Sequence, residues 1–600
     1  MLAATAALVV VASACGATAA KPVSRSSGGT VTFAEEIGAP PTYIFPIEDG
    51  ANSGNNNITY LQPEMWRPLY WFGHANSQAP TINYSLSLAK APVWSDGGKT
   101  ATITLNHYSW SNGTPVTTRD VEFFINLLKA NSADYVGFSP GWWMDEISSI
   151  EYSSSTQFSI TFNGVYNTSW LVDNGLSEIT AIPQSDWDRT SASGPVGNYD
   201  TSTSGAQAVY SFLNKQSETL STWDTDPLWQ MVDGPFRLAL NNGFSPTTGL
   251  VEMVPNPDYS GPVKPKISRL EELPFTSAAA EFDAVLAGRV DYGYLPFTDL
   301  NERAHLKKLG DKVDTWLDWG FTSSGLTFPN RAVGTVLDQL YVRQAMQRLI
   351  NQPLYIKKIF GGYATPTYGP VPVSPKTSYV DSYVSKNPLP YDPAAAKKLL
   401  QEHGWKVVPN GASSCQKAGT GVGECGAGIT KGTQLKLSMI YTAGNPDYTQ
   451  EMQAMQSSFA SAGIQLTLKS APFDQVLTEA YSCVPATGSG CSNAMGYLGS
   501  PNWTYVPTYF PSGDPLIEDT GIVYPGDPAF VKQILSRVTL SHQPGLQGLY
   551  NYENFVAKEV PFIWLPNAAY QISVISHKLK GISAQDTTGH IYPENWSLSS

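Results

Sequence analysis

Residues 94–129, WSDGGKTATITLNHYSWSNGTPVTTRDVEFFINLLK, carry three local structural signals in succession. SDGG is a turn signal, and the TATITL that follows at 100–105 alternates Thr with apolar residues, the period of two that a half-buried strand requires. SNGTP is a second turn, and Thr117 with Asp120 matches the capping box that begins a helix. The next residues place an apolar stripe on one helical face: Val121, Phe124, Ile125 and Leu128. We predict a hairpin, a turn and an amphipathic helix, with structural roles for the polar residues of the turn and the cap.

A second helix is predicted in YDPAAAKKLLQEHGW at 391–405. Asp392 is the expected N-cap, Pro393 suits the first helical position, and Gly404 ends the helix. His403 lies on the apolar face of this helix, so we expect it to pack or cap rather than to bind a ligand.

A strand, a helix and a second strand are predicted in succession later in the chain. LKLSMIY (435–441) and IQLTLKSA (464–471) are strand-like, and the segment between them is helical over roughly 448–462. Upstream, DQLYVRQAMQRLINQPLYI (338–356) has a helical apolar stripe that Pro353 kinks or restarts. A β–α–β unit of this kind favours an α/β lobe with a partly parallel sheet.

Size and composition narrow the class of protein. The chain has 600 residues, 42% of them hydrophobic, which is enough to bury the cores of two or three lobes. Its 16 Trp and 31 Tyr include polar-tipped side chains of the kind that solute-binding clefts use. The formal net charge is −13 and there is no long run of Lys or Arg, so a nucleic acid partner, which needs a basic surface, is not expected.

Motifs of enzyme chemistry are missing from the sequence. There is no GxSxG at a strand-to-helix elbow, no phosphate loop, no HExxH and no GxGxxG that opens a helix. The adjacent carboxylates Glu35–Glu36 and Asp145–Glu146 would point to opposite faces of a strand, so we expect a surface or turn role for each pair instead of glycosidase chemistry. We therefore expect no catalytic residues, no metal site and no cofactor.

The N-terminal segment is predicted to direct export. Residues 1–14 carry a short apolar stretch that cannot span a bilayer and suits a signal peptide. The small residues before Cys15 resemble a lipobox, so we expect Cys15 to be lipidated and residues 15–29 to form a flexible tether. The alternative is a secretory signal that is cleaved near ATAA.

The remaining cysteines form two close pairs in Gly-rich segments. Cys415 and Cys425 flank one segment, and Cys483 and Cys491 flank the other. In an oxidising compartment each pair could close a small loop, and local pairing is the simplest connectivity. A zinc site is the rival interpretation, which the lack of a CxxC and the scattered His disfavour.

Seven segments of the chain, taken in order, resemble the extracellular solute-binding proteins of bacterial ABC importers, in particular the large oligopeptide-, dipeptide- and nickel-binding family. These segments span nearly the whole mature chain. They are residues 94–129, DGPFRLA (233–239), VPNPDYSGPVKPKISRLE (254–271), AVLAGRVDYGYLP (284–296), DQLYVRQAMQRLINQPLYI (338–356), YDPAAAKKLLQEHGW (391–405) and PFIWLPN (561–567).

The resemblance implies an α/β fold of two lobes, like a clam shell, with an extra subdomain inserted in the first lobe. Solute would bind between the lobes, and closure about a hinge would present the closed form to a membrane permease. By this analogy the chain divides as follows: first lobe 30–65, 177–290 and 569–600; inserted subdomain 66–176; second lobe 297–568.

The resemblance also implies where a solute would lie: against the loop after the first strand, the crossover between lobes, and an aromatic-rich strand and loop late in the second lobe. We expect ligand contacts from Asn56, Tyr294, Trp319, Tyr497, Asn502, Trp503 and Tyr505.

Peptides are the ligand class that the resemblance favours, with oligosaccharides or other neutral solutes second and a nickel chelate third. Peptide binders of this family usually hold the peptide's α-amino group with an Asp in the late loop, whereas YLGSPNWTY (497–505) has no acidic residue. A buried ammonium needs a carboxylate, so Asp49, Asp514 or another acid would have to replace it. We expect a monomeric, lipid-anchored receptor on the outer face of the cell membrane, with permease subunits as partners, and not an enzyme. A secreted hydrolase is the opposing class.

Overall fold

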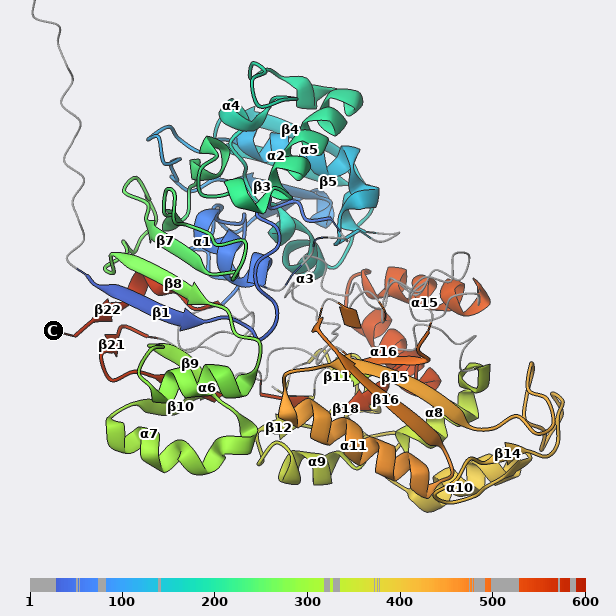
Figure 1. Cartoon of the computed structure of the whole chain (residues 1–600). Coiled ribbons are helices and arrows are strands. Elements are labelled where there is room, and N and C mark those ends of the chain that lie inside the picture. The colour runs from blue at the N-terminus through green and yellow to red at the C-terminus, as the bar shows by residue number, and fades with distance from the viewer. Residues whose placement is uncertain are drawn as a thin grey trace, which may run out of the picture.

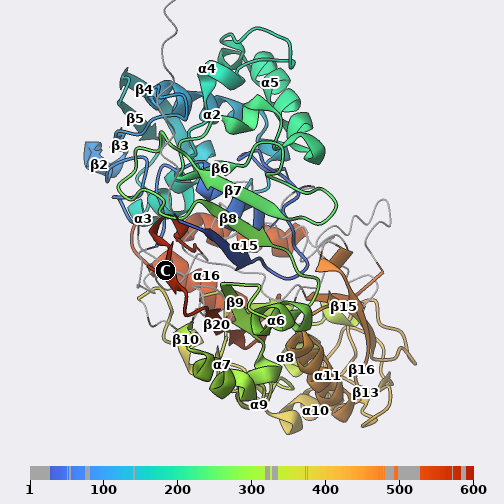
Figure 2. The same ribbon diagram turned by 60° about the vertical axis from the view of Figure 1, so that its left-hand side comes forward.

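The computed structural model describes most of the chain. The described residues are 28–49, 52, 54, 56–73, 82–138, 142–317, 324–326, 335–371, 373–374, 376, 378–473, 475–476, 479, 492–497, 528–569, 572–582 and 590–599. In two views, helices α4 (Gln184–Trp187) and α5 (Thr203–Ser217) lie at one end of the molecule and helices α9 (Gln352–Lys358) and α10 (Pro393–Glu402) at the other (Figures 1 and 2). We call the half around the largest sheet the first lobe. The half around the sheet of β15 (Lys436–Thr442), β16 (Gln465–Ala471) and β17 (Met495–Tyr497) is the second lobe.

The first lobe is built on a mixed sheet of seven strands. Its order is β10 (Lys312–Leu317), β20 (Ile572–Ile575), β9 (Tyr292–Leu295), β1 (Thr30–Ala34), β8 (Arg269–Leu273), β7 (Val251–Pro255) and β6 (Phe236–Leu238). β1 runs parallel to both of its neighbours, β8 and β9. The sheet thus joins strands from the beginning, the middle and the end of the chain.

The hairpin, turn and helix predicted in residues 94–129 are confirmed. β2 (Val93–Ser95) pairs antiparallel with β3 (Thr100–Thr104), and β3 continues into a four-stranded sheet with β5 (Gln157–Phe162) and β4 (Ile147–Ser154). α2 (Thr118–Ala130) begins with the predicted capping box, in which the Thr117 backbone N–H donates to Asp120 Oδ2 at 2.8 Å. The predicted apolar stripe of this helix is buried: Val121, Phe124, Ile125 and Leu128.

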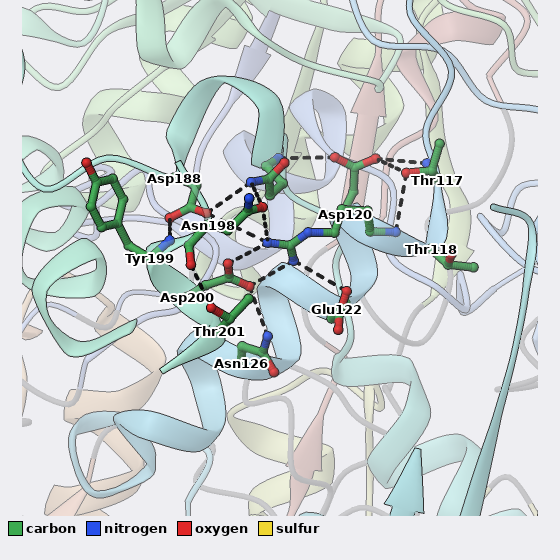
Figure 3. Close-up of polar contacts among 12 residues, drawn as sticks. Thr117, Thr118, Asp120, Glu122, Asn126, Asp188, Asn198, Tyr199, Asp200 and Thr201 are labelled. Atoms are coloured by element: carbon green, nitrogen blue, oxygen red, sulfur yellow. Dashed lines mark hydrogen bonds and ion pairs between the residues drawn. The ribbon is translucent and has the colours of Figure 1, made fainter. Parts of the chain in front are cut away.

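Polar contacts hold α2 to the segment that follows it. The Arg119 guanidinium donates to Asp200, and Asn126 Nδ2 donates to the same carboxylate at 2.9 Å. Asp188 and Glu122 also lie within ion-pair distance of Arg119 (Figure 3). Every contact in this group is internal to the lobe, so the cap and its surroundings are scaffold, as the sequence predicts.

The second lobe contains the predicted β–α–β unit. β15 (Lys436–Thr442) pairs in parallel with β16 (Gln465–Ala471) and with β17 (Met495–Tyr497), and α11 (Pro446–Ser461) connects β15 to β16. Met452, Met455 and Phe459 on α11 are fully buried, which explains why the helix packs on this small sheet.

The remaining helices and short strands complete the two lobes. Helices of the first lobe are α1 (Gln62–Met65), α3 (Thr168–Trp170), α4 (Gln184–Trp187), α5 (Thr203–Ser217), α6 (Ala278–Leu286) and α7 (Arg303–Leu309). Helices that follow it are α8 (Leu340–Gln347), α9 (Gln352–Lys358), α10 (Pro393–Glu402), α15 (Pro528–Ser541) and α16 (Gln547–Glu559). Short strand pairs are β11 (Ser324–Leu326) with β18 (Ile563–Leu565), β12 (Ala364–Thr365) with β19 (Asn567–Ala568), β13 (Trp405–Lys406) with β14 (Ser414–Cys415), and β21 (Leu579–Lys580) with β22 (Ser597–Leu598).

The predicted N-cap and C-terminal glycine of α10 and the predicted proline at the start of α9 are confirmed. Asp392 Oδ1 accepts a hydrogen bond from the Ala395 backbone N–H at 2.9 Å at the start of α10. Gly404, just past its end, has a φ of +76°, which a residue with a side chain rarely adopts. Pro353 lies in the first turn of α9, so the helix restarts there after α8.

Two large hydrophobic cores divide the molecule. One surrounds the seven-stranded sheet and also takes in Ile534 and Val538 of α15, and the other surrounds α8, α11 and the β15–β17 sheet. The lobe boundaries that the resemblance implies stay a prediction. The strand order is relevant to the boundary at residue 297, because β10 follows that residue in the sequence yet pairs within the first sheet. No helix in the described part of the chain combines the length and apolar character of a membrane span.

Candidate functional site

The loop after β1 directs two adjacent carboxylates to different environments. Glu35 is fully buried and accepts a hydrogen bond from Asn56 Nδ2 at 3.3 Å, whereas Glu36 is partly exposed. The expected surface or turn role is therefore wrong for Glu35. Alternation along an extended segment, which the sequence indicates, sends one of the two side chains inward, and here the inside is the lobe core.

Asn56, an expected ligand contact, lies in the interior of the first lobe. Its side chain is fully buried, and among the described residues only its Nδ2 has a hydrogen-bond partner, the Glu35 carboxylate. Its neighbour Asn57 accepts hydrogen bonds from the Thr42 and Tyr43 backbone N–H groups at 2.8 and 3.2 Å and so shapes the loop. A ligand contact by Asn56 stays a prediction.

Glu35 belongs to a buried acidic cluster of four glutamates and one arginine: Glu35, Glu64, Arg67, Glu272 and Glu594. Arg67 Nη2 pairs with Glu594 Oε1 at 2.9 Å, and both side chains are removed from water. Burial, reinforced by Glu272, raises the pKa of Glu35 well above its usual value, and burial raises the pKa of Glu272 to about 8. Burial also raises the pKa of Glu64 well above its usual value, so the protonated form is favoured for Glu35, Glu64 and Glu272, the three glutamates outside the ion pair.

Tyr294, another expected contact, is part of an aromatic group within the seven-stranded sheet. It lies on β9, and its ring centroid is 5.8 Å from that of Tyr292 and 6.3 Å from that of Phe33 on β1. The ring is 5% exposed, so its main contact is packing within the sheet. The loop residue Asp49, considered as a replacement acid, accepts hydrogen bonds from the Asn52 backbone N–H and side-chain amide, and its role as that acid stays a prediction.

Tyr497, the last residue of β17, lies in a second polar group in the other lobe. Its hydroxyl donates to Glu451 Oε2 at 3.2 Å, and its ring packs edge to face on Tyr448 with centroids 5.4 Å apart. Glu451 and Tyr448 both lie in the first two turns of α11. Burial raises the pKa of Glu451 to about 8, against the lowering effect of the Tyr497 hydrogen bond.

Glu451 is not among the site residues predicted from the sequence, although the sequence carries a signal for it. Glu451 occupies a position on the same helical face as Met455 and Phe459, and all three are fully buried. A glutamate at an apolar position of a helix is expected to be buried with its neighbours. Because charged residues are almost never fully buried without a partner, such a glutamate also indicates a partner for its carboxyl.

The two lobes approach each other between the loop after β1 and the turn that begins α11. Gly444 lies in that turn with a φ of +99°, and a Cβ placed on it would lie 3.1 Å from the Thr276 carbonyl oxygen and 3.6 Å from Ile37 Cγ2. Across the same approach, Glu36 contributes to the raised pKa of Tyr448, after the larger effects of burial and of Asp447. We call the region of Glu36, Ile37, Thr276 and Gly444 the seam.

A second contact joins helix α3 and the residue before it to the segment that follows helix α15. The His542 ring stacks on Trp170 with centroids 3.7 Å apart and an angle of 11° between planes. The Asn167 backbone N–H donates to the His542 carbonyl oxygen at 2.7 Å, and its Nδ2 donates to the Gly545 carbonyl oxygen at 3.4 Å.

Three histidines of the described chain stack on aromatic rings: His403 on Tyr341, His542 on Trp170 and His590 on Trp71. His403 lies 3.8 Å from Tyr341 and hydrogen-bonds to the Leu399 carbonyl oxygen through Nδ1 at 2.8 Å, as its packing role predicts. No group of three or more His, Cys, Asp or Glu side chains within the described ranges is arranged to hold a metal ion.

The other expected site residues fall partly outside the described residues. Trp319, Asn502, Trp503, Tyr505, Asp514, Cys15, Cys483 and Cys491 all lie there. Cys415 and Cys425 are joined by a disulfide whose Cα atoms are 6.1 Å apart. Of the expected ligand contacts that the structure describes, Asn56 and Tyr294 belong to the first lobe and Tyr497 to the second, on either side of the seam.

Comparison with known proteins identifies the family. The model of the bacterial extracellular solute-binding proteins, family 5 Middle, matches residues 83–487, more than half of the chain. A glutathione-binding protein, GsiB, of Shigella flexneri serotype 5b is 46% identical over 77 residues, which are 13% of this chain and 14% of that protein. A putative ABC transporter peptide-binding protein of Brucella ovis is 25% identical over 372 residues, 61% of this chain and 60% of that protein.

The similarity in fold extends over nearly the whole chain. The structure of the oligopeptide-binding protein AppA from Bacillus subtilis, in complex with a nonapeptide, superposes with a TM-score of 0.68 at 14% sequence identity, covering 96% of this chain and 99% of that one. The curated relatives are matched over less than two thirds of their own length, whereas the similarity in fold covers nearly the whole of both chains. The chain has the mixed α/β fold of these binding proteins and belongs to the bacterial extracellular solute-binding proteins of family 5.

Proposed function

We propose that this protein is an extracytoplasmic receptor that captures peptides between its two lobes and delivers them to the permease of an ABC importer. The observation that carries the proposal is the family match over residues 83–487. The Brucella ovis relative named as a peptide-binding protein and the shared fold with a nonapeptide complex support peptides as the solute class.

The physical basis is a binding event that is coupled to closure. A solute that contacts both lobes stabilises only the arrangement in which the lobes are together, so binding energy becomes a change in shape that a permease can recognise. The proposed lobes are 30–65 with 177–290 and 569–600, and 297–568, with 66–176 inserted in the first. The proposed contacts with solute are Asn56, Tyr294, Trp319, Tyr497, Asn502, Trp503 and Tyr505.

The proposal includes the location of the protein. Lipidation of Cys15 would anchor it to the outer face of the cell membrane, and residues 15–29 would act as the tether. The disulfide between Cys415 and Cys425 suits an oxidising compartment outside the cytoplasm. The receptor is proposed to act as a monomer and to bind, not to transform, its solute.

A neutral solute such as an oligosaccharide is the second candidate. The observation that favours it is the absence of acidic residues from YLGSPNWTY (497–505), since Trp and Tyr rings and Asn amides bind neutral sugars by stacking and hydrogen bonding.

Native mass spectrometry separates these candidates. Recombinant residues 28–600 are purified without denaturation, and any bound solute is then released by unfolding and weighed. Peptide masses are the expected result. Sugar masses would replace peptides by the second candidate, whereas an empty protein that cleaves added peptides or glycans would overturn the receptor function altogether.

A further inference from the structure

Glu451 is a buried carboxyl of the second lobe, and only one of its two oxygens has a hydrogen-bond partner in the described part of the chain. The residue is fully buried, Oε2 accepts the hydroxyl of Tyr497 at 3.2 Å, and Oε1 has no hydrogen-bond partner in the described part of the chain. The hydroxyl of Tyr355 on α9 is likewise buried without a described partner, and the charge of Glu451 contributes to raising its pKa after burial itself. Leaving buried polar groups unpaired costs on the order of 1–3 kcal/mol each, so such groups indicate a missing partner.

The position of Glu451 within the lobe is one that α/β proteins use for ligands. β15, β16 and β17 are parallel, Tyr497 is the last residue of β17, and α11 begins four residues after the end of β15. Because the carboxyl ends of parallel strands meet at one edge of the sheet, Tyr497 and the first turns of α11 lie at that edge together. Ligands of open parallel sheets bind outside this edge.

The same edge approaches the first lobe at the seam. Gly444, which lies between β15 and α11, is in close approach to Ile37 and Thr276. Tyr448, one turn before Glu451, packs on Tyr497. The charge of Glu36, across the seam, contributes to the raised pKa of Tyr448. The unpaired carboxyl is thus one helical turn away from the place where the lobes meet.

The electrostatic surroundings of Glu451 contain acids and phenols but, among the groups that act on it, no cation. Burial raises its pKa most, the Tyr497 hydrogen bond lowers it, and the neighbouring Asp447 raises it further. Tyr448 and Tyr355 also face this region. A cation bound beside Glu451 would therefore favour the ionised form of its carboxyl, since an opposite charge at close range favours the charged form.

We propose that Glu451 is a specificity-determining residue of the solute site and pairs with an ammonium group of the solute, with the Tyr497 hydroxyl as the positioning donor. This inference rests on the proposed function. The acid proposed here lies on helix α11. It belongs neither to YLGSPNWTY (497–505), which has no acidic residue, nor to the loop of Asp49. On binding, the carboxylic acid gives its proton to solvent and the carboxylate pairs with the cation, so that up to one proton is released per solute.

A mixed-peptide selection tests the proposal. Residues 28–600 are stripped of bound solute by unfolding and refolded, then incubated with a tryptic digest of serum albumin mixed with an equal amount of the same digest after isotope-labelled acetylation of its amines. The ratio of free to acetylated peptide retained is read by mass spectrometry. The native sequence is expected to favour free amines at least tenfold, and Glu451→Gln, which is close in shape and still accepts the Tyr497 hydrogen bond, is expected to lose that preference.

Two controls keep the outcomes distinct. Glu553→Gln removes a different fully buried carboxyl, on α16, whose pKa burial raises to about 9, and it is expected to retain the preference for free amines. For a peptide selected by this screen, calorimetry in two buffers of different ionisation enthalpy counts released protons, which the native sequence should show and Glu451→Gln should lack.

Each result decides between the inference and the function beneath it. Peptides retained with equal free-amine preference in the native sequence and in Glu451→Gln would overturn the role of Glu451 while leaving peptide binding intact. Equal retention of free and acetylated peptide by the native sequence would do the same. If the native sequence retains neither free nor acetylated peptides, peptide binding itself is overturned, and the role of Glu451 with it.

Discussion

Arg67 and Glu594 form an ion pair that is removed from water, and the pair ties the C-terminal segment to the start of the chain. Nη2 and Oε1 are 2.9 Å apart, and the guanidinium also lies 4.0 Å from the Trp71 ring centroid. Two buried charges stabilise each other only while both are present, because removal of one leaves the other uncompensated in a region of low dielectric.

Arg67→Met is therefore expected to lower the free energy of unfolding by about 3 kcal/mol. The matched control is Lys398→Met, since Lys398 and Glu402 are 3.7 Å apart but 73% and 56% exposed, and such a pair contributes less than about 1 kcal/mol. Chemical denaturation of both variants measures the difference. Equal effects of the two substitutions would show that the buried pair has no special role.

The buried glutamates predict how stability depends on pH. Burial raises the pKa of Glu272 to about 8, whereas its ordinary value is 4.5, so the folded state binds more protons than the unfolded state between these values. The associated stability is complete below about pH 4.5 and is lost as pH rises through about 8. Replacing the group with a neutral amide removes its share of this loss.

Glu272→Gln is thus expected to flatten the decline in unfolding free energy between pH 6 and pH 8 by about 2 kcal/mol. Denaturation at several pH values tests this, with Glu271→Gln as control, because Glu271 is the next residue on β8 and faces away from the core. A decline as steep in Glu272→Gln as in the native sequence would contradict the assignment.

At the scale of elements, the capping box of α2 is a device that can be tested alone. Thr117→Ala removes the hydroxyl that accepts from the Arg119 backbone N–H at 3.3 Å and is expected to cost about 1 kcal/mol. Thr117→Ser keeps the hydroxyl and should stay within about 0.5 kcal/mol of the native sequence. The measurement is again the unfolding free energy, and an equal loss in both variants would assign the effect to the methyl group instead.

Elements whose signals are local could be predicted from the sequence, and buried polar groups mostly could not. The hairpin at β2–β3, the cap of α2 and the β–α–β unit around α11 depend on turns, caps and periodicity that neighbouring residues carry. The burial of Glu35, by contrast, depends on β8, whose residues follow it by more than 230 positions and bring Glu272 beside it. Such a contact is set by the tertiary fold and leaves no local mark.

The candidate site divides in the same way. The resemblance selected Tyr497 because of its place in a family segment, but only the structure brings it against Glu451. Asn56 was selected for its loop, and the structure turns its side chain toward Glu35 in the lobe interior. The resemblance implies which loops lie around the solute, whereas the direction of each side chain depends on packing from both lobes.

At the scale of the whole molecule, the Trp170–His542 stack joins two proposed lobes and is expected to stabilise their closed arrangement. An aromatic stack of this kind contributes about 1 kcal/mol, which corresponds to roughly a fivefold change in an equilibrium constant. His542→Ala is thus predicted to speed solute release about fivefold without changing the solute that is selected. Stopped-flow displacement measures the release rate, and an unchanged rate would remove this stack from the closure.

The central claim, that solute is held between two lobes that close around it, is tested most directly by small-angle X-ray scattering. Residues 28–600, stripped of solute and then resupplied with the peptide that copurifies, are measured under the same buffer conditions. Closure of the lobes around the solute predicts a smaller radius of gyration in the loaded protein. Stoichiometric binding with an unchanged radius of gyration would place the solute elsewhere and would contradict closure.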